Sequence, residues 1–248
     1  MMGVPLWAIE IAARFWHDAG SEEGFPRNLR RAIANALPLT VVLLPKLRLA
    51  GIGTWLREQD IFCTLDVRDR PLRACLVARY GQGIVFLDGS DSDDEQRFSL
   101  AHEVAHFLKD YWRPRHDVAD RLGPHVLEVL DGDRPARHEE RVHALLSNLR
   151  IGYHVHLMDR TAEGRFADAT IGAAERAADI LAYELLAPST VVLDEMEAYP
   201  PTTRREVTTD LLRSAYHLPD AAATSYASLL IPQADHTNSF VRRLGLIS

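Results

Sequence analysis

The sequence has 248 residues, of which 47% are hydrophobic and 25% are charged, and these proportions exclude a disordered chain. Its formal net charge of −7 gives no general attraction to a phosphate backbone, so we expect no direct nucleic-acid partner. No apolar run approaches the roughly 20 residues that a membrane-spanning helix needs, and the N-terminus lacks the basic start of a signal peptide. Cys63 and Cys75 show no CxxC or metal-type spacing. We therefore expect a cytoplasmic protein with buried, reduced cysteines and no membrane partner.

The first third of the chain predicts helices followed by a small sheet. Helical patterns cover 4–19 and 26–37, and an apolar stretch broken by Pro38 and Pro45 becomes helical in its second half, up to about Gln59. Three segments rich in Ile, Val, Phe and Cys are then separated by short turns. Such turns favour antiparallel neighbours. We predict a three-stranded, mainly antiparallel sheet from 61–67, 72–80 and 83–88.

The rest of the chain is mainly helical. Ser92 followed by Glu95 is a capping box, and it predicts a helix that continues to about Trp112. Another helix runs from about 169 to 186 and ends before Pro188, because a residue that precedes proline is disfavoured in a helix. The fold class is therefore α+β and helix-rich. Four further helices are predicted at 117–130, 136–150, 203–216 and 219–231.

The predicted helix that starts at Ser92 carries the sequence His102-Glu103-Val104-Ala105-His106. Residues four apart lie one turn apart on the same face of a helix, so both imidazoles can bind one metal ion at ~2.0–2.1 Å. In an HExxH motif, the glutamate that follows the first histidine serves as the general base of a metallopeptidase. His102 and His106 are thus candidate metal ligands, and Glu103 is the candidate catalytic residue.

A second helix supplies the carboxylates that such a site would need. Glu175 and Asp179 are four apart and share one face of the helix that ends before Pro188. A catalytic zinc ion has three protein ligands, and Glu175 would be the third. Asp179 would then accept the free N–H of a ligating histidine and fix the orientation of that ring.

The segments "RFSLAHEVAHFL" and "ERAADILAYELLAP" together resemble the ImmA/IrrE family of metallo-endopeptidases. The resemblance covers roughly 51–232 and implies a zincin-like core, a single Zn²⁺ ion, and cytoplasmic proteolysis of a helix-turn-helix repressor. Mn²⁺ is an alternative to Zn²⁺, because histidine and carboxylate ligands suit several metals. The resemblance assigns His102, His106 and Glu175 as ligands and Glu103 as the acid/base. Val104-Ala105 departs from the family's usual pair with glycine, and Leu181 and Ala187 replace Phe and Met.

The distance along the chain between His106 and Glu175 is about twice what the family leads us to expect. We therefore predict an N-terminal helical segment at 1–50, a core at 51–190 with an insertion at about 113–167, and a C-terminal helical segment at 191–248. A lid, a substrate-recognition surface and a dimer contact are all compatible with the insertion. The oligomeric state is not set by the sequence.

Other residues of the core could assist the chemistry. A hydrogen-bond donor usually stabilises the developing oxyanion, and spacing alone does not rank the candidates. The strand at 83–88 would be the template for an extended substrate at a sheet edge. The oxyanion candidates are Tyr111, Tyr153, His154, Tyr183 and Tyr216.

Two features favour ordinary interpretations. His154 and His156 would share one face of a strand, where they could bind metal or substrate, but we interpret them as surface residues or as residues with satisfied hydrogen bonds. The segment 209–230 resembles a helix-turn-helix, yet its second helix, from about Asp220, has no Lys or Arg with which to read DNA. We expect that helix pair to pack on the core.

The motifs predict a zinc-dependent endopeptidase, and the resemblance implies that it cleaves a regulatory protein, a transcriptional repressor, in stress response or mobile-element control. One alternative is a regulatory protein that sequesters a repressor and holds zinc for structural reasons. Glu103 argues against this alternative, because a structural zinc site needs no base. A second alternative is a zinc amidohydrolase that acts on a small molecule.

Overall fold

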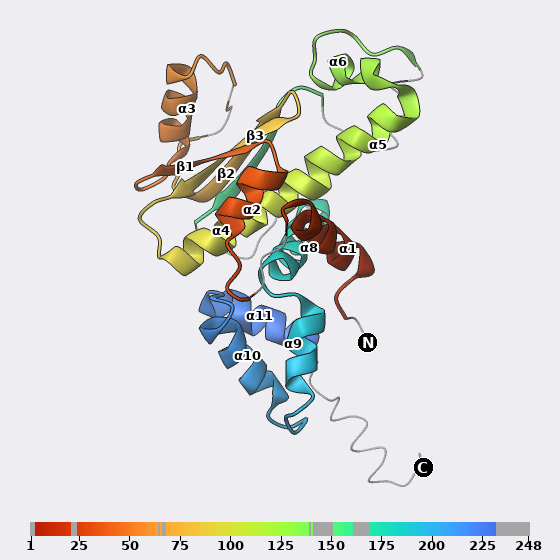
Figure 1. The fold of residues 1–248 in the computed structure, drawn as a ribbon. Coiled ribbons are helices and arrows are strands. Elements are labelled where there is room, and N and C mark those ends of the chain that lie inside the picture. Colours follow the sequence, from red (N-terminus) through yellow and green to blue (C-terminus); the bar gives the residue numbers. More distant parts are fainter. Residues whose placement is uncertain are drawn as a thin grey trace.

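The computed structural model describes residues 3–20, 24–63, 65, 68–138, 140, 151–160 and 169–231. Figure 1 shows an α+β fold in which a small sheet is packed against helices, as the sequence predicts. No helix in these ranges is long and apolar enough to cross a membrane. In chain order the elements are α1 (Leu6–Asp18), α2 (Leu29–Ala36), β1 (Leu39–Leu44), α3 (Leu49–Glu58), β2 (Leu72–Arg79), β3 (Gln82–Asp88), α4 (Asp93–His106), the π-helix η1 (Phe107–Trp112), α5 (Arg113–Leu122), the 3-10 helix η2 (Pro124–Val126), α6 (Leu127–Leu130), β4 (His154–Asp159), α8 (Ala169–Leu186), α9 (Ser189–Met196), α10 (Arg204–Ser214) and α11 (Asp220–Leu230).

The sheet has four described strands in the order β1-β3-β2-β4. β2 is antiparallel to both β3 and β4, whereas β1 is parallel to β3. β2 and β3 form a hairpin whose turn residues Tyr80 and Gly81 both have positive φ, 54° and 75°. Two successive positive φ values match the right-handed twist of a tight hairpin. The sheet is therefore mixed and larger by one strand than predicted.

Two strand predictions are wrong in detail. The described residues of 61–67, namely 61–63 and 65, form no strand, and β1 lies instead in the apolar stretch between Pro38 and Pro45. Proline cannot donate to a β-ladder but is tolerated at a strand end, so these two prolines bound the strand instead of breaking it. β3 is also not an edge strand, because it lies between β1 and β2. On the side nearer the site, the edge belongs to β4.

The two faces of the sheet pack against different helices. Alternate residues of β2 such as Ala74 and Leu76 share a core with α1, α4 and α8, while Cys75 and Val77 pack with α3. This alternation follows from the strand period of two. Figure 1 shows α3 apart from the main helical layer. The helical layer is the side on which the candidate site is built.

One continuous rod, made of α4, η1 and α5, passes under the sheet (Figure 1). Its start is capped as predicted, because the Glu95 backbone N–H donates to the Ser92 hydroxyl oxygen at 3.4 Å. Acidic residues fill the first turn, where the helix dipole favours negative charge. α8 packs on α4, and this contact brings the second candidate helix to the first.

The C-terminal helices α9, α10 and α11 lie beyond the end of α8, away from the sheet (Figure 1). Tyr226 of α11 donates to the carboxylate of Glu184 at 2.5 Å, and the Ser189 backbone N–H donates to the same carboxylate at 3.1 Å. Buried Leu212 and Ala223 join the main core. Most of the helix predicted at 136–150, and the tail from 232, lie outside the described residues.

Candidate metal centre

The two imidazoles of the HExxH sequence lie side by side on α4. The Nε2 atoms of His102 and His106 are 3.2 Å apart, and the residues are 2% and 3% exposed. The spacing of four residues along a helix accounts for this alignment. The motif therefore presents two buried ring nitrogens to one point.

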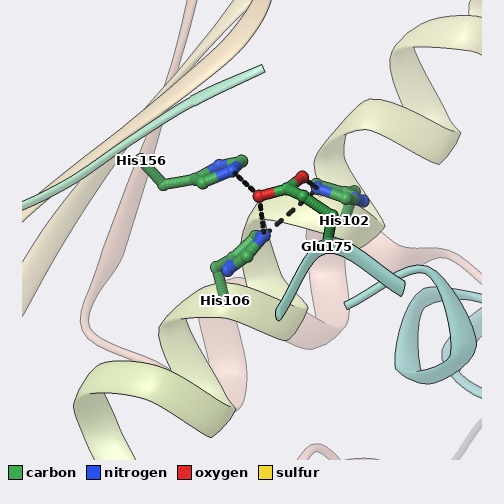
Figure 2. A group of neighbouring side chains, drawn as sticks. All are labelled: His102, His106, His156 and Glu175. Carbon is green, nitrogen blue, oxygen red and sulfur yellow. Dashed lines mark hydrogen bonds and ion pairs between the residues drawn. The ribbon is translucent and has the colours of Figure 1, made fainter. Parts of the chain in front are cut away.

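Glu175 of α8 reaches the same point from a distant part of the chain. Its Oε2 lies 3.3 Å from Nε2 of His102, and its Oε1 lies 3.7 Å from Nε2 of His106. Figure 2 shows the carboxylate between the rings. The crossing of α4 and α8 thus assembles the three residues that the sequence singled out.

Carboxylates hold the outer nitrogens of both rings. Nδ1 of His102 lies 2.9 Å from Asp179, the residue predicted for this place, and Nδ1 of His106 lies 2.7 Å from Asp110. Asp110 also pairs with Lys109. Sequence reasoning did not find Asp110, although its position four residues after His106 was the available signal. In both rings Nδ1 is engaged, and Nε2 points inward.

His156 of β4 is a third imidazole in the cluster, so it is not a surface residue, and both of its ring nitrogens have hydrogen-bond partners, as the other interpretation expects. Its Nε2 lies 2.9 Å from Oε1 of Glu175, its Nδ1 lies 2.9 Å from Oε2 of Glu103, and its ring stacks on His106 at 3.7 Å between centroids. His156 pairs with Leu76 of β2, so it points toward the α4 side of the sheet. The signal was the strand alternation, but the pairing of this strand with β2 could not be read from the sequence.

Glu103 is completely buried, with an exposed fraction of 0%. Its Oε2 contacts His156, whereas Oε1 has no hydrogen-bond partner among the described residues. A buried carboxylate oxygen normally has a partner, which can be an ordered water. Oε1 of Glu103 is therefore available to accept a hydrogen bond from a water or a substrate.

The charges of the cluster are strongly coupled. Burial lowers the pKa of His102, but the carboxylates of Asp179 and Glu175 outweigh it and raise that pKa to about 9. Burial also lowers the pKa of His156, and Glu103 and Glu175 raise it to about 10. Burial raises the pKa of Glu175, but the three histidines hold it far below its usual value. Protons and a cation would compete for the same imidazole nitrogens.

The donor set fits a divalent transition-metal ion. His102, His106, His156 and Glu175 each offer one ligand atom, and these atoms lie within 4.8 Å of one another. Two ligand atoms at ~2.0–2.1 Å from a tetrahedral ion are about 3.4 Å apart, which is close to the 3.2 Å and 3.3 Å separations from Nε2 of His102. Imidazole and carboxylate together suit zinc and several of its neighbours.

The structure does not bring the predicted oxyanion candidates into this cluster. The hydroxyl of Tyr111 accepts from the Gly81 backbone N–H at 2.7 Å, and the ring of His154 lies 5.8 Å from that of Tyr111. Tyr153 lies under the guanidinium of Arg79. The ring of Tyr183 stacks on Phe98 and Tyr226, and Tyr216 donates to Glu195.

Comparison with known proteins gives a match for the part of the chain that contains the HExxH motif. The family model described as the IrrE N-terminal-like domain matches residues 64–124. Neither the comparison with curated proteins nor that with solved structures gave a match. The matched range contains the HExxH sequence but neither His156 nor Glu175, and it indicates a metallopeptidase-type domain. The match supports the resemblance to the ImmA/IrrE family that the two motifs indicate, over the part of the chain that carries the first motif.

Proposed function

We propose that the protein is a zinc-dependent endopeptidase that hydrolyses a peptide bond in a regulatory protein, with a helix-turn-helix transcriptional repressor as the substrate class. The convergence of His102, His106 and Glu175, with the buried Glu103 beside them, carries the proposal. In this proposal the first three residues hold the ion. When bound, the ion would supply a Lewis acid that polarises the scissile carbonyl and acidifies water.

Glu103 has the position that a general acid/base needs. Its free oxygen, Oε1, can accept a proton from the water that attacks the peptide carbonyl and can return that proton to the leaving amine. Complete burial keeps the carboxylate away from bulk water. Asp179 and Asp110 orient the imidazoles of His102 and His106, so the geometry around Glu103 is fixed from both sides.

The first test is proteolysis of a repressor that is encoded beside the gene. We expect cleavage by the wild-type protein, loss of cleavage with a chelator, and recovery when zinc is added back. Glu103→Gln should retain zinc but cleave at least about 10²-fold more slowly, because the general base is removed. Glu95→Gln is the matched control, since Glu95 lies in the first turn of the same helix and pairs with Arg73.

Metal content tests the ligand assignment, and cleavage separates this function from its alternatives. His102→Ala and Glu175→Ala should lose the ion, as measured by metal analysis of the purified variants. Undiminished cleavage by Glu103→Gln would remove Glu103 from the mechanism. Stoichiometric binding of the repressor without cleavage by the zinc-loaded wild type would instead favour sequestration.

A further inference from the structure

The three imidazoles of the cluster share one orientation. Each directs Nε2 toward the carboxylate of Glu175, at 3.3 Å for His102, 3.7 Å for His106 and 2.9 Å for His156. Figure 2 shows His156 approaching from the strand side, while the other two approach from α4. The common target means that an ion placed beside Glu175 would face three ring nitrogens.

The outer nitrogen of each ring lies on a carboxylate. Nδ1 of His102 lies on Asp179, that of His106 on Asp110 and that of His156 on Glu103, all within 2.9 Å. A ligating histidine almost always donates its other N–H to a carboxylate, a carbonyl or water, which fixes the tautomer that leaves Nε2 free. His156 therefore has the same supporting contact as the two histidines of the motif.

We propose that His156 is a fourth protein ligand of the metal centre, supplied by the edge strand β4. The inference rests on the metal centre of the proposed function, but it does not depend on the identity of the peptide substrate. It adds to that centre a residue that lies outside the matched range 64–124 and inside the segment that the sequence marked as an insertion.

The ring positions show what binding would require. Two imidazoles on one tetrahedral ion have centroids about 5 Å apart, given nitrogen–metal distances of ~2.0–2.1 Å. The ring of His102 lies 4.9 Å from that of His106 and 5.4 Å from that of His156, so these pairs already fit. His106 and His156 are stacked at 3.7 Å and must move apart. β4 pairs with β2 alone among the described strands, so one side of it is open to such a shift.

A fourth protein ligand would fill the coordination position that a catalytic metal ion keeps open for water or substrate. Structural zinc sites are closed by four protein ligands, whereas catalytic sites keep one position open. With Nε2 of His156 bound to the ion, the four-ligand coordination shell would be complete. Nδ1 of the same ring contacts Oε2 of Glu103. Peptide hydrolysis then requires His156 to leave the ion. The edge strand thus sets whether the centre is closed or open.

The experiment uses the full chain loaded with zinc. X-ray absorption of the wild-type protein should count three imidazoles per zinc ion and not two. Competition with a chromogenic chelator should show that His156→Ala weakens zinc binding by at least about tenfold. Removing a group that only supports a ligating histidine already costs about 10–100-fold in metal affinity, so the loss of a ligand should cost at least the lower figure. His154→Ala is the matched control, because it removes an imidazole from the same face of the same strand and should leave the affinity unchanged.

Substitution of cobalt for zinc tests whether the fourth coordination position of the ion is closed. Azide should change the visible spectrum of the His156→Ala protein, which has an open position, and should have little effect on the wild type. Should His156→Ala fail to fold, as judged by circular dichroism, His156→Asn replaces it and the wild-type imidazole count still decides.

Two results would overturn the inference. One is a count of two imidazoles together with equal zinc affinity in the wild type and His156→Ala. The other is an unchanged affinity with a lower kcat at saturating zinc, which would make His156 an oxyanion-stabilising group and not a ligand. Failure of the proposed function looks different, because zinc-loaded wild-type protein would then leave the repressor uncleaved, whatever number of imidazoles binds the ion.

Discussion

At the scale of single residues, the site is a set of paired charges. Four carboxylates, from Glu103, Asp110, Glu175 and Asp179, contact three buried or nearly buried imidazoles. Buried charges persist in proteins only when they are paired or bind metal. The excess of acidic groups over imidazoles leaves room for added positive charge, either as protons or as a cation.

Asp179 provides a test of this pairing. Because Asp179 helps to raise the pKa of His102 to about 9, Asp179→Asn should lower that pKa toward the ordinary value in metal-free protein. His102 would then lose its proton at a lower pH, and the stability that comes from the charged pair would be lost at a lower pH as well. An NMR titration of the imidazole resonances measures the shift.

The control is Asp117→Asn, which removes an exposed carboxylate from α5. We also expect Asp179→Asn to weaken zinc binding by about 10–100-fold, because the ring loses the partner that orients it. An unchanged pKa of His102 in the Asp179 variant would show that the 2.9 Å contact does not persist in solution.

What could be predicted at this scale follows the helix period. His102, His106 and Asp179 could be placed by spacing, because residues four apart on a helix meet whatever the rest of the fold does. His156 could not, because its partner strand β2 lies about 80 positions earlier in the chain and pairing over such a separation leaves no local pattern. For the same reason, the contact between His156 and Glu103 could not be predicted from the sequence.

At the scale of elements, the turn between α8 and α9 is fixed by a buried carboxylate. Glu184 is 2% exposed and accepts from the Tyr226 hydroxyl and from the Ser189 backbone N–H. Burial raises the pKa of Glu184, although both hydrogen bonds lower it. This contact joins α11 to the end of the helix that carries Glu175.

Tyr226→Phe should therefore destabilise the protein by about 1–3 kcal/mol, because a hydrogen bond to a buried, charged group is lost. Urea unfolding followed by circular dichroism gives the change in the free energy of unfolding. Tyr199→Phe is the control, since Tyr199 is 43% exposed. Equal midpoints for the two variants would contradict the role given to Tyr226.

Element types were easier to predict than strand boundaries. The capping box at Ser92 and the stop before Pro188 are local signals, and both helix ends lie where they indicate. The strand predicted at 61–67 has suitable residue types, but strand propensity depends on an available partner. The second neighbour of β3 is β1, which lies between Pro38 and Pro45. These prolines argue against a strand inside the segment, but at the two ends of a strand they are tolerated.

At the scale of the whole molecule, the sheet separates two cores with different contents. One contains α1, α4 and α8 and carries the candidate site, and the other is smaller and is closed by α3. Cys75 lies in the smaller core with no exposed surface, and Cys63 is half-buried at its border. Burial raises the pKa of both thiols, so neither forms the reactive thiolate readily.

We expect a thiol reagent to modify one cysteine of the native protein slowly, Cys63, and to reach Cys75 only after unfolding. Mass spectrometry of the labelled peptides identifies the site, and Cys63→Ser removes the slow reaction and so isolates that of Cys75. Equal labelling rates for the two cysteines in native protein would contradict the burial of Cys75.

The position of Cys75 has a practical consequence. Because its sulfur lies in the smaller core that α3 closes, its alkylation rate reports the opening of that core without any introduced label. A ligand that binds only the closed, folded state lowers the open population by a factor of 1 + [L]/Kd, where [L] is the free ligand concentration. Comparing alkylation rates across a series of zinc concentrations would therefore measure how much of the protein's resistance to opening comes from the ion.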